Sequence, residues 1–171
     1  REINVINNLA FECGIPFAMH QDIIWRGGTM HSNVINRNIF ISSFNTPLLS
    51  SYRTQENDIK RFGEIDSNFF YYPVIADTIN NNLFEEVIES TLRQKYSISE
   101  WQNKYQYEIN SQFLSIDNKH YSKYIRIFYN DRRNKKTINL GHEQYSDPGG
   151  RIFKGTLILD PYEWVCLIKV N

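Results

Sequence analysis

The chain has 171 residues with 19 basic and 19 acidic side chains, so its formal net charge at pH 7 is zero. A neutral chain gives no electrostatic reason to expect nucleic acid or an anionic membrane as a partner, and no apolar run approaches the roughly 18 residues of a membrane span. Tyrosine, phenylalanine and asparagine are abundant. This composition disfavours a helix bundle, because aromatic residues favour strands and asparagine is a poor helix former.

A repeat begins within the first residues. The segment Asn4–Phe11 matches Asn33–Phe40 at five of eight positions with an offset of 29 residues. A third copy, Glu64–Phe70, keeps the same alternation and places Ile65 30 residues after Ile35. A period in this range predicts a solenoid.

Each copy predicts one coil made of short strands. Apolar pairs such as Val34-Ile35 and Ile39-Phe40 are separated by polar residues at a spacing too short for a helix. Asparagine, glycine, aspartate and serine at the corners tolerate tight turns. The predicted coils span residues 1–32, 33–56 and 57–76, and we interpret them as a parallel β-helix.

The period breaks over 77–107, because Ile65 and Ile109 are 44 residues apart. We predict an insertion here with two short helices, Glu85–Leu92 and Ser99–Tyr105. Ser99 and Gln102 would form a capping box at the start of the second helix.

Longer alternating strands follow the insertion. Strands are predicted within Tyr121–Tyr129, Thr137–Leu140, Arg151–Leu159 and Glu163–Val170, with a loop from His142 to Gly150. The open end of a solenoid must be covered. We therefore predict two parts, β-helix coils over 1–111 and a C-terminal antiparallel β cap over 112–171.

Several short sequence segments resemble those of a known family. The pattern Asn-x-Ile-x-x-Asn-x-Phe at coil spacing, Tyr96–Gln102 followed by Glu108–Ser111, and Gly155–Glu163 resemble segments of secreted bacterial proteins of the pectate-lyase-like superfamily. Glu108 stands where the family pattern usually has aspartate. The resemblance implies a right-handed parallel β-helix that acts on polysaccharide as a lyase or glycoside hydrolase. It also implies a secreted, periplasmic or cell-surface location and makes calcium a candidate cofactor.

The ends of the chain and its cysteines yield two further expectations. Because the repeat starts within three residues of Arg1, we expect preceding N-terminal coils of the same protein, which could hold the catalytic centre. Cys13 and Cys166 have apolar neighbours and are interpreted as buried thiols without a disulfide.

The segment from His20 to His31 is the chemically most mixed stretch. It holds two histidines, an aspartate, an arginine and a tryptophan, with Gly27-Gly28 allowing an open loop. Lyase chemistry needs a base and a positive charge or metal to stabilise an enolate, whereas hydrolysis needs paired carboxylates. Asp22 with Glu64 or Asp66 is the carboxylate pair that we consider. The candidate catalytic residues are Asp22, Arg26, His31 and Glu64, and the candidate substrate-binding residues are His20, Trp25 and Arg61.

Other interpretations of these residues stay open. The histidines also fit ordinary coil-edge positions, and His20, Asp22 and His31 fit an iron-binding triad only loosely. Asn7, Asn36, Asn38 and Asn68 are interpreted as internal ladders or turn residues. The clusters Lys60-Arg61 and Arg132–Lys136 fit solvated turns or contacts to an acidic glycan. A non-catalytic glycan-binding or adhesin-type β-helix is the alternative function, and a trimeric phage-type tail fibre is a third candidate.

Overall fold

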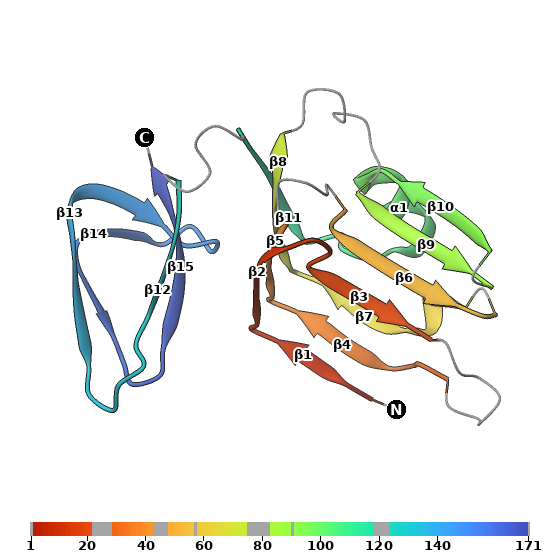
Figure 1. Cartoon of the computed structure of the whole chain (residues 1–171), viewed down its shortest axis with the longest axis horizontal. Helices are drawn as coiled ribbons and strands as arrows, with labels where there is room; N and C mark the ends of the chain where they lie inside the picture. The colour runs from red at the N-terminus through yellow and green to blue at the C-terminus, as the bar shows by residue number, and fades with distance from the viewer. Residues whose placement is uncertain are drawn as a thin grey trace. The chain divides into compact units, whose positions relative to one another are not determined.

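The computed structural model describes residues 2–21, 29–42, 48–56, 58–74, 83–89, 91–117 and 124–170. The chain forms two compact units, Arg1–Asn118 and Lys119–Asn171. Strands dominate both units, as Figure 1 shows. The prediction of a mostly β chain with parallel sheets is therefore confirmed.

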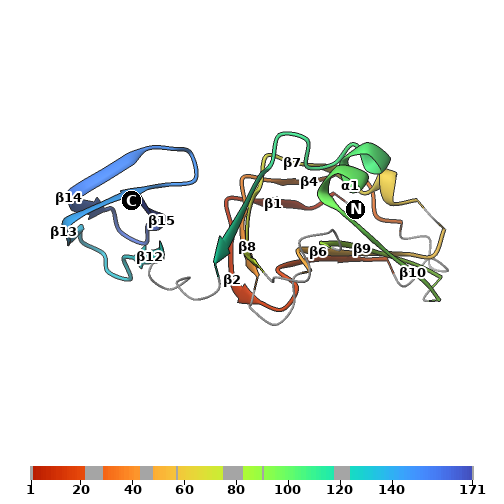
Figure 2. The same ribbon diagram turned by 90° about the horizontal axis from the view of Figure 1, so that it is seen from above.

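Three sheets build the first unit, and the chain visits them in a constant order. The first sheet contains β1 (Asn4–Ile6), β4 (Asn33–Asn36) and β7 (Gly63–Asp66), all parallel. The second contains β2 (Leu9–Cys13), β5 (Ile39–Ser42), β8 (Phe69–Val74) and β11 (Gln112–Asp117), again parallel. The third contains β3 (Phe17–His20), β6 (Ser50–Thr54), β9 (Phe84–Ile88) and β10 (Leu92–Tyr96). Figure 2 looks along the stack, with the three sheets as its sides.

The register between coils differs by one residue from the sequence repeat. Val5 pairs with Ile35, which pairs with Ile65, so successive coils are offset by 30 residues. The offset of 29 would have aligned Ile6 with Ile35, but Ile6 is 38% exposed on the outer face. A one-residue slip turns every side chain of a strand to the other face. Burial of Val5, Ile35 and Ile65 against the core therefore selects the register.

A ladder of asparagines fixes the corner between the first and second sheets. Asn8 Nδ2 donates to Asn38 Oδ1 at 3.2 Å, and Asn38 Nδ2 donates to Asn68 Oδ1 at 3.0 Å. Each Oδ1 also accepts a backbone N–H from the preceding coil. The predicted ladder is thus present at Asn38 and Asn68, with Asn8 as its first member. Asn7 has the predicted turn role, with a φ of 59°, whereas Asn36 ends β4 and is not part of the ladder.

Aromatic side chains fill the core between the sheets. The rings of Phe40 and Phe70 lie 5.1 Å apart, and those of Phe70 and Phe113 lie 5.0 Å apart and stack. Phe17 adds a ring 5.3 Å from Phe40 at the other end. Because the strands carry these residues at matching register positions, the core continues from coil to coil.

The predicted insertion is built differently from the expectation. The segment Glu85–Leu92 is not a helix, because β9 pairs in parallel with β6 and continues the stack. β10 then turns back antiparallel on β9, which makes the third sheet mixed. The second predicted helix is confirmed as α1 (Ile98–Tyr105), although its capping box uses Ser97 and Glu100.

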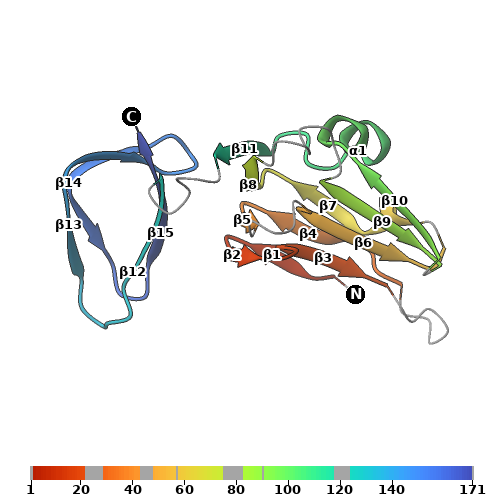
Figure 3. The same cartoon turned by 45° about the horizontal axis from the view of Figure 1, so that its top comes forward.

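Helix α1 covers the end of the stack opposite β1 to β3, as Figure 3 shows. Trp101 is fully buried, and its ring stacks on that of Phe84 at 5.2 Å and lies tilted against that of Tyr52 at 4.7 Å. The apolar end of the last coil is thus closed within the first unit. The C-terminal strands that were expected to cover this end as a β cap belong to the second unit. β11 was expected to be part of that cap, but it pairs with β8 and therefore belongs to the first unit.

The second unit is one antiparallel sheet in the order β12, β15, β13, β14. Its core contains Leu140, Tyr145, Leu157, Leu159 and Leu167. The strands are β12 (Ile125–Tyr129), β13 (Lys136–Ser146), β14 (Ile152–Leu159) and β15 (Trp164–Val170). The predicted loop from His142 to Gly150 is confirmed only over 147–150, because β13 continues through a bulge at Gly141, whose φ is 67°, as far as Ser146.

Candidate functional site

The candidate site lies where the chain passes from the third sheet to the first. His20 ends β3, and His31 stands two residues before β4. Arg61 ends the 3-10 helix Ile59–Arg61, two residues before β7. Because Asn33 pairs with Gly63, His31 and Arg61 occupy the same position on successive coils. The fold therefore places these three exposed residues at one corner.

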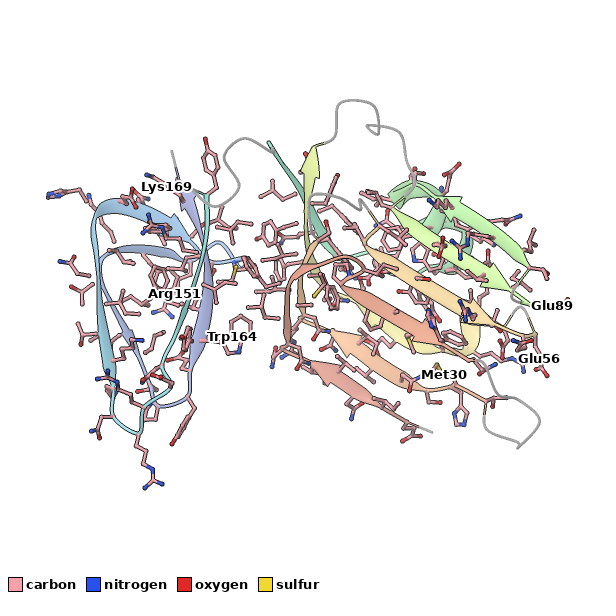
Figure 4. All side chains as sticks on the ribbon, viewed as in Figure 1. Met30, Glu56, Glu89, Arg151, Trp164 and Lys169 are labelled. Atoms are coloured by element: carbon pink, nitrogen blue, oxygen red, sulfur yellow. The ribbon has the colours of Figure 1, made fainter. Side chains whose placement is uncertain are left out.

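A buried hydrogen-bond frame holds this corner together. Gln21 Oε1 accepts the backbone N–H of Met30, so the residues next to His20 and His31 are joined. Gln21 Nε2 also donates to Asp58 Oδ2 at 3.2 Å, and Thr54 Oγ1 donates to Asp58 Oδ1. Asp58 stands directly before the turn that carries Arg61, so the frame links two coils. Met30 and Glu56 mark this side of the unit in Figure 4.

Close backbone packing also positions Arg61 relative to His31. Phe62 O accepts the backbone N–H of Asn33 at 3.0 Å. A Cβ on Gly63 would lie 2.0 Å from the Asn33 carbonyl oxygen, and its φ is 138°. Glycine is therefore required at this position for the two coils to approach each other.

Glu64 lies on the outer face of the first sheet, next to the corner. It is exposed and pairs with Val34 in register. Asp66 is one step further along the same face, and its carboxylate accepts the backbone N–H and Nδ2 of Asn110 at 2.7 and 2.6 Å. Asp66 thus has a local structural role, whereas Glu64 faces solvent.

The fold therefore brings some of the predicted site residues to one corner. His20, His31 and Arg61 share the corner, and Glu64 adjoins it. Within the part of the chain that the structure describes, no hydrogen bond or ion pair joins any two of these four residues. The predictions for Asp22, Trp25 and Arg26 lie outside the described residues.

The corner has the chemical groups for proton transfer and anion binding. Imidazoles exchange protons near neutral pH, and a guanidinium binds a carboxylate with two parallel hydrogen bonds. Among the described residues, no group of three or more histidine, cysteine, aspartate or glutamate side chains is placed to hold a metal ion. The described part of the corner thus offers base and cation without a metal centre.

A second polar cluster, which was not expected from the sequence, lies where α1 packs on β9 and β10. Lys104 Nζ donates to Glu86 Oε2 at 2.6 Å, and the Tyr96 hydroxyl donates to the same oxygen at 2.6 Å. The Tyr105 hydroxyl donates to the other oxygen of Glu86. The Lys104 ammonium also lies 4.6 Å from the ring centre of Tyr96 and 5.0 Å from that of Tyr105.

The protonation states of this cluster favour a fixed ion pair. Burial opposes ionisation of Glu86, but the hydrogen bonds from Lys104, Tyr105 and Tyr96 outweigh it and lower the pKa of Glu86. Burial likewise opposes the charge on Lys104, but hydrogen bonds with Glu86 and Tyr96 raise the pKa of Lys104. The cluster anchors α1 through the ion pair between Lys104 and Glu86. The available sequence signal was the alternation of Phe84, Glu86 and Ile88, which turns a carboxylate toward the core.

Glu108 is a third polar group that the sequence did not single out as functional. Its side chain is 0% exposed and accepts hydrogen bonds from Asn68 Nδ2, at 3.0 and 3.2 Å, and from the Ser111 hydroxyl. It thus closes the asparagine ladder. Burial raises the pKa of Glu108 from 4.5 to about 7, although the hydrogen bonds from Ser111 and Asn68 act in the opposite direction. Full burial excludes Glu108 from contact with a polymer substrate.

Comparisons with known proteins leave the class to be defined by fold and site alone. The chain matches no protein-family model, no curated protein and no solved structure. Among the described residues, no helix has the length and apolar character to cross a membrane. The class is a mostly β protein with three sheets visited in turn and a polar corner that links successive coils.

Proposed function

We propose that the first unit is a right-handed parallel β-helix from a protein that cleaves acidic polysaccharide by β-elimination. The order in which the chain visits the three sheets and the 30-residue register support the β-helix. A secreted, periplasmic or cell-surface location follows from the polymeric substrate.

The observation that carries the proposal is the meeting of His20, His31 and Arg61 at one corner on two successive coils. In the proposed reaction an imidazole takes the proton on the carbon α to the uronate carboxylate. Arg61 binds that carboxylate and stabilises the enolate. The bond from the β carbon to the glycosidic oxygen then breaks, a double bond forms between the α and β carbons, and the leaving oxygen takes up a proton.

The carboxylates near the corner keep hydrolysis as the competing reaction. Hydrolysis needs two carboxyl groups that face one glycosidic bond. Asp58, the carboxylate in the corner frame, is buried and already accepts hydrogen bonds from Gln21 and Thr54. Glu56 and Glu64 are exposed carboxylates beside the described corner, and they stand before and after the turn that carries Arg61. Calcium, a candidate from the family resemblance, would have to be tested by addition and chelation.

The test is a polysaccharide panel assayed for unsaturated uronate absorbance and for new reducing ends. The full chain should produce both signals on an acidic polymer such as polygalacturonic acid. His31→Ala and Arg61→Ala should each lower kcat/KM by about 100-fold or more. His142→Ala and Lys60→Ala are matched controls, because both residues are exposed and Lys60 neighbours Arg61 on the same turn. Reducing ends without absorbance would replace the lyase with a hydrolase.

A non-catalytic glycan-binding or adhesin-type β-helix is the second candidate function. The observation in its favour is that the four described candidates are not joined to one another by hydrogen bonds or ion pairs. Binding of an acidic polymer that Arg61→Ala weakens, with neither absorbance nor new ends, would establish this second function.

A further inference from the structure

The turns at one end of the second unit form a single surface, which we call the tip. The tip contains the turn from Asn130 to Lys136, between β12 and β13, and the turn from Asp160 to Glu163, between β14 and β15. Both turns lie at the same end of the sheet in Figure 1. The tip belongs to the second unit, and none of its residues takes part in the corner described above.

One buried side chain ties the two turns together. Asn130 is 2% exposed, and its Nδ2 donates to the backbone oxygens of Asn134, Leu159 and Asp160 at 2.9, 3.2 and 2.9 Å. Its Oδ1 accepts the backbone N–H of Arg132 at 3.1 Å. The backbone N–H of Asn130 also donates to Glu163 O at 2.8 Å. The tip is therefore a preorganised surface rather than two independent loops.

Exposed aromatic rings stand on this surface. Tyr129 is 60% exposed and pairs in register with Trp164, which is half-buried. Tyr162 is 67% exposed and has a φ of 61°. A bulky residue in the left-handed region is strained, and glycine or asparagine would fit at less cost. Keeping an exposed tyrosine there without a core contact indicates a use for the ring.

Charges of both signs surround the rings, with a small excess of positive charge. The first turn has four basic residues and one acidic residue, Asp131, and the second turn adds Asp160 and Glu163. Lys135 pairs with Asp160 at 3.0 Å, and Lys136 lies 5.2 Å from the ring centre of Tyr129 while donating to Tyr129 O at 2.9 Å. Arg132 and Arg133 are both exposed. The tip thus combines aromatic faces with guanidinium groups that point to an anionic partner.

We propose that the tip binds an acidic polysaccharide. Tyrosine rings stack on the apolar faces of sugar rings, and arginine pairs with the carboxylate or sulfate groups along the chain. A glycan fits better than nucleic acid, because nucleic-acid binding proteins typically neutralise about 6 to 10 phosphates, whereas the exposed cations of the tip are few and the whole chain is neutral. The inference takes its polymer class from the proposed function but does not depend on catalysis at the corner.

The experiment is a titration of the full chain with polygalacturonic acid, with a fully methyl-esterified polymer and with a single-stranded DNA oligonucleotide. Tyr162→Gly removes the ring and relieves the strained backbone, so the variant should keep or raise its thermal stability. Its affinity for polygalacturonic acid should fall about fivefold or more. Arg133→Gln should also weaken binding and reduce its dependence on salt.

Arg151→Gln is the matched control, because Arg151, labelled in Figure 4, is an exposed arginine at the opposite end of the same sheet. Its affinity should equal that of the unchanged chain. Equal loss in Arg151→Gln and Arg133→Gln, or unchanged affinity in Tyr162→Gly, would refute the tip as a glycan site. DNA binding that is tighter and has the same variant pattern would replace the glycan with nucleic acid.

A parallel titration of Arg61→Ala separates the two proposals. This variant should lose turnover yet still bind polygalacturonic acid through the tip. Turnover that persists while Tyr162→Gly binds normally would leave the proposed function standing and remove only the inference about the tip.

Discussion

Replacing Glu108 with glutamine tests the account of the ladder and its buried terminus. The Glu108 carboxyl is fully buried, and its pKa is raised from 4.5 to about 7 by burial. In the unfolded chain the group ionises at its ordinary pKa, so between these two values the folded state holds a proton that the unfolded state has lost. The free energy of unfolding must therefore fall as the pH rises through this window.

The size of the effect follows from the pKa difference. At ~1.4 kcal/mol for each unit of pKa, ionised Glu108 costs the fold about 3 kcal/mol above neutral pH. Glutamine keeps the shape of the side chain and an oxygen that accepts from Asn68 Nδ2, and it carries no charge. Glu108→Gln should exceed the stability of the unchanged chain by about 1 kcal/mol or less at pH 5 and by about 3 kcal/mol at pH 8.

The assay is urea denaturation between pH 5 and 8, followed by the fluorescence of Trp101 in a Trp25→Phe, Trp164→Phe background. Trp101 lies on the buried face of α1 and thus reports on the first unit. Glu64→Gln, which changes an exposed carboxyl of the same unit, should leave the pH profile unchanged. Parallel pH profiles for Glu108→Gln and the unchanged chain would refute a raised pKa for Glu108.

Three further substitutions or reactions probe packing. Gly63→Ala should lower the free energy of unfolding by about 3 kcal/mol or more, because the added Cβ would lie 2.0 Å from Asn33 O. Gly149→Ala, whose Cβ meets only the Asp147 side chain at 3.3 Å, is the control, with urea unfolding followed by circular dichroism because Gly149 lies in the second unit. Similar losses in both variants would contradict the close approach. Trp101→Ala should lower the free energy of unfolding, followed by circular dichroism, by about 3 to 5 kcal/mol, since the ring fills the end of the core against Phe84 and Tyr52. An unchanged melting temperature would argue against α1 as the cover of the stack. With a thiol reagent at pH 8, Cys13 should react in the native chain and Cys166 only after denaturation, because burial raises the pKa of the Cys166 thiol to about 12; equal rates would exclude burial of Cys166.

The coil architecture could be predicted from sequence because its signals are local. Short apolar pairs and polar corners located β1, β2, β4, β5, β7 and β8, and Asn38 and Asn68 were recognised as internal. The exact register could not be obtained from sequence identity, because five matches at an offset of 29 outweighed the burial pattern that selects 30. Phe11 was thereby aligned with Phe40, whereas Ala10 is the residue that pairs with it.

The end of the stack was harder to predict for a physical reason. Glu85-Glu86 looks polar enough for an exposed helix, but both carboxylates are buried by partners that come from other elements. Glu86 depends on Lys104 and on Tyr105 of α1, and Glu85 pairs with Arg93 at 3.4 Å. Tertiary partners of this kind leave no periodic signal in the strand itself.

Only part of the candidate site could be predicted, because some of its residues meet through tertiary contacts that leave no local signal. The mixed composition of His20 to His31 is visible in the sequence, and Arg61 could be added from the repeat. The frame of Gln21, Thr54 and Asp58 was not foreseen, because these polar residues come together only when two coils stack. The tip of the second unit depends likewise on Asn130, which bridges segments about thirty residues apart.

The asparagine ladder also limits how a chain of this kind can change in length. Each amide needs its counterpart 30 residues away, so a residue gained or lost inside a coil would separate the two partners. A detour that leaves the stack and returns in register has no such cost. The stretch with β10 and α1 is an example, since it returns Ser111 to Asn68 after 43 residues, where the Ser111 hydroxyl oxygen accepts the Asn68 backbone N–H at 2.8 Å. New surface features can thus be acquired as insertions in the loops between strands, while the stacked strands keep a fixed length.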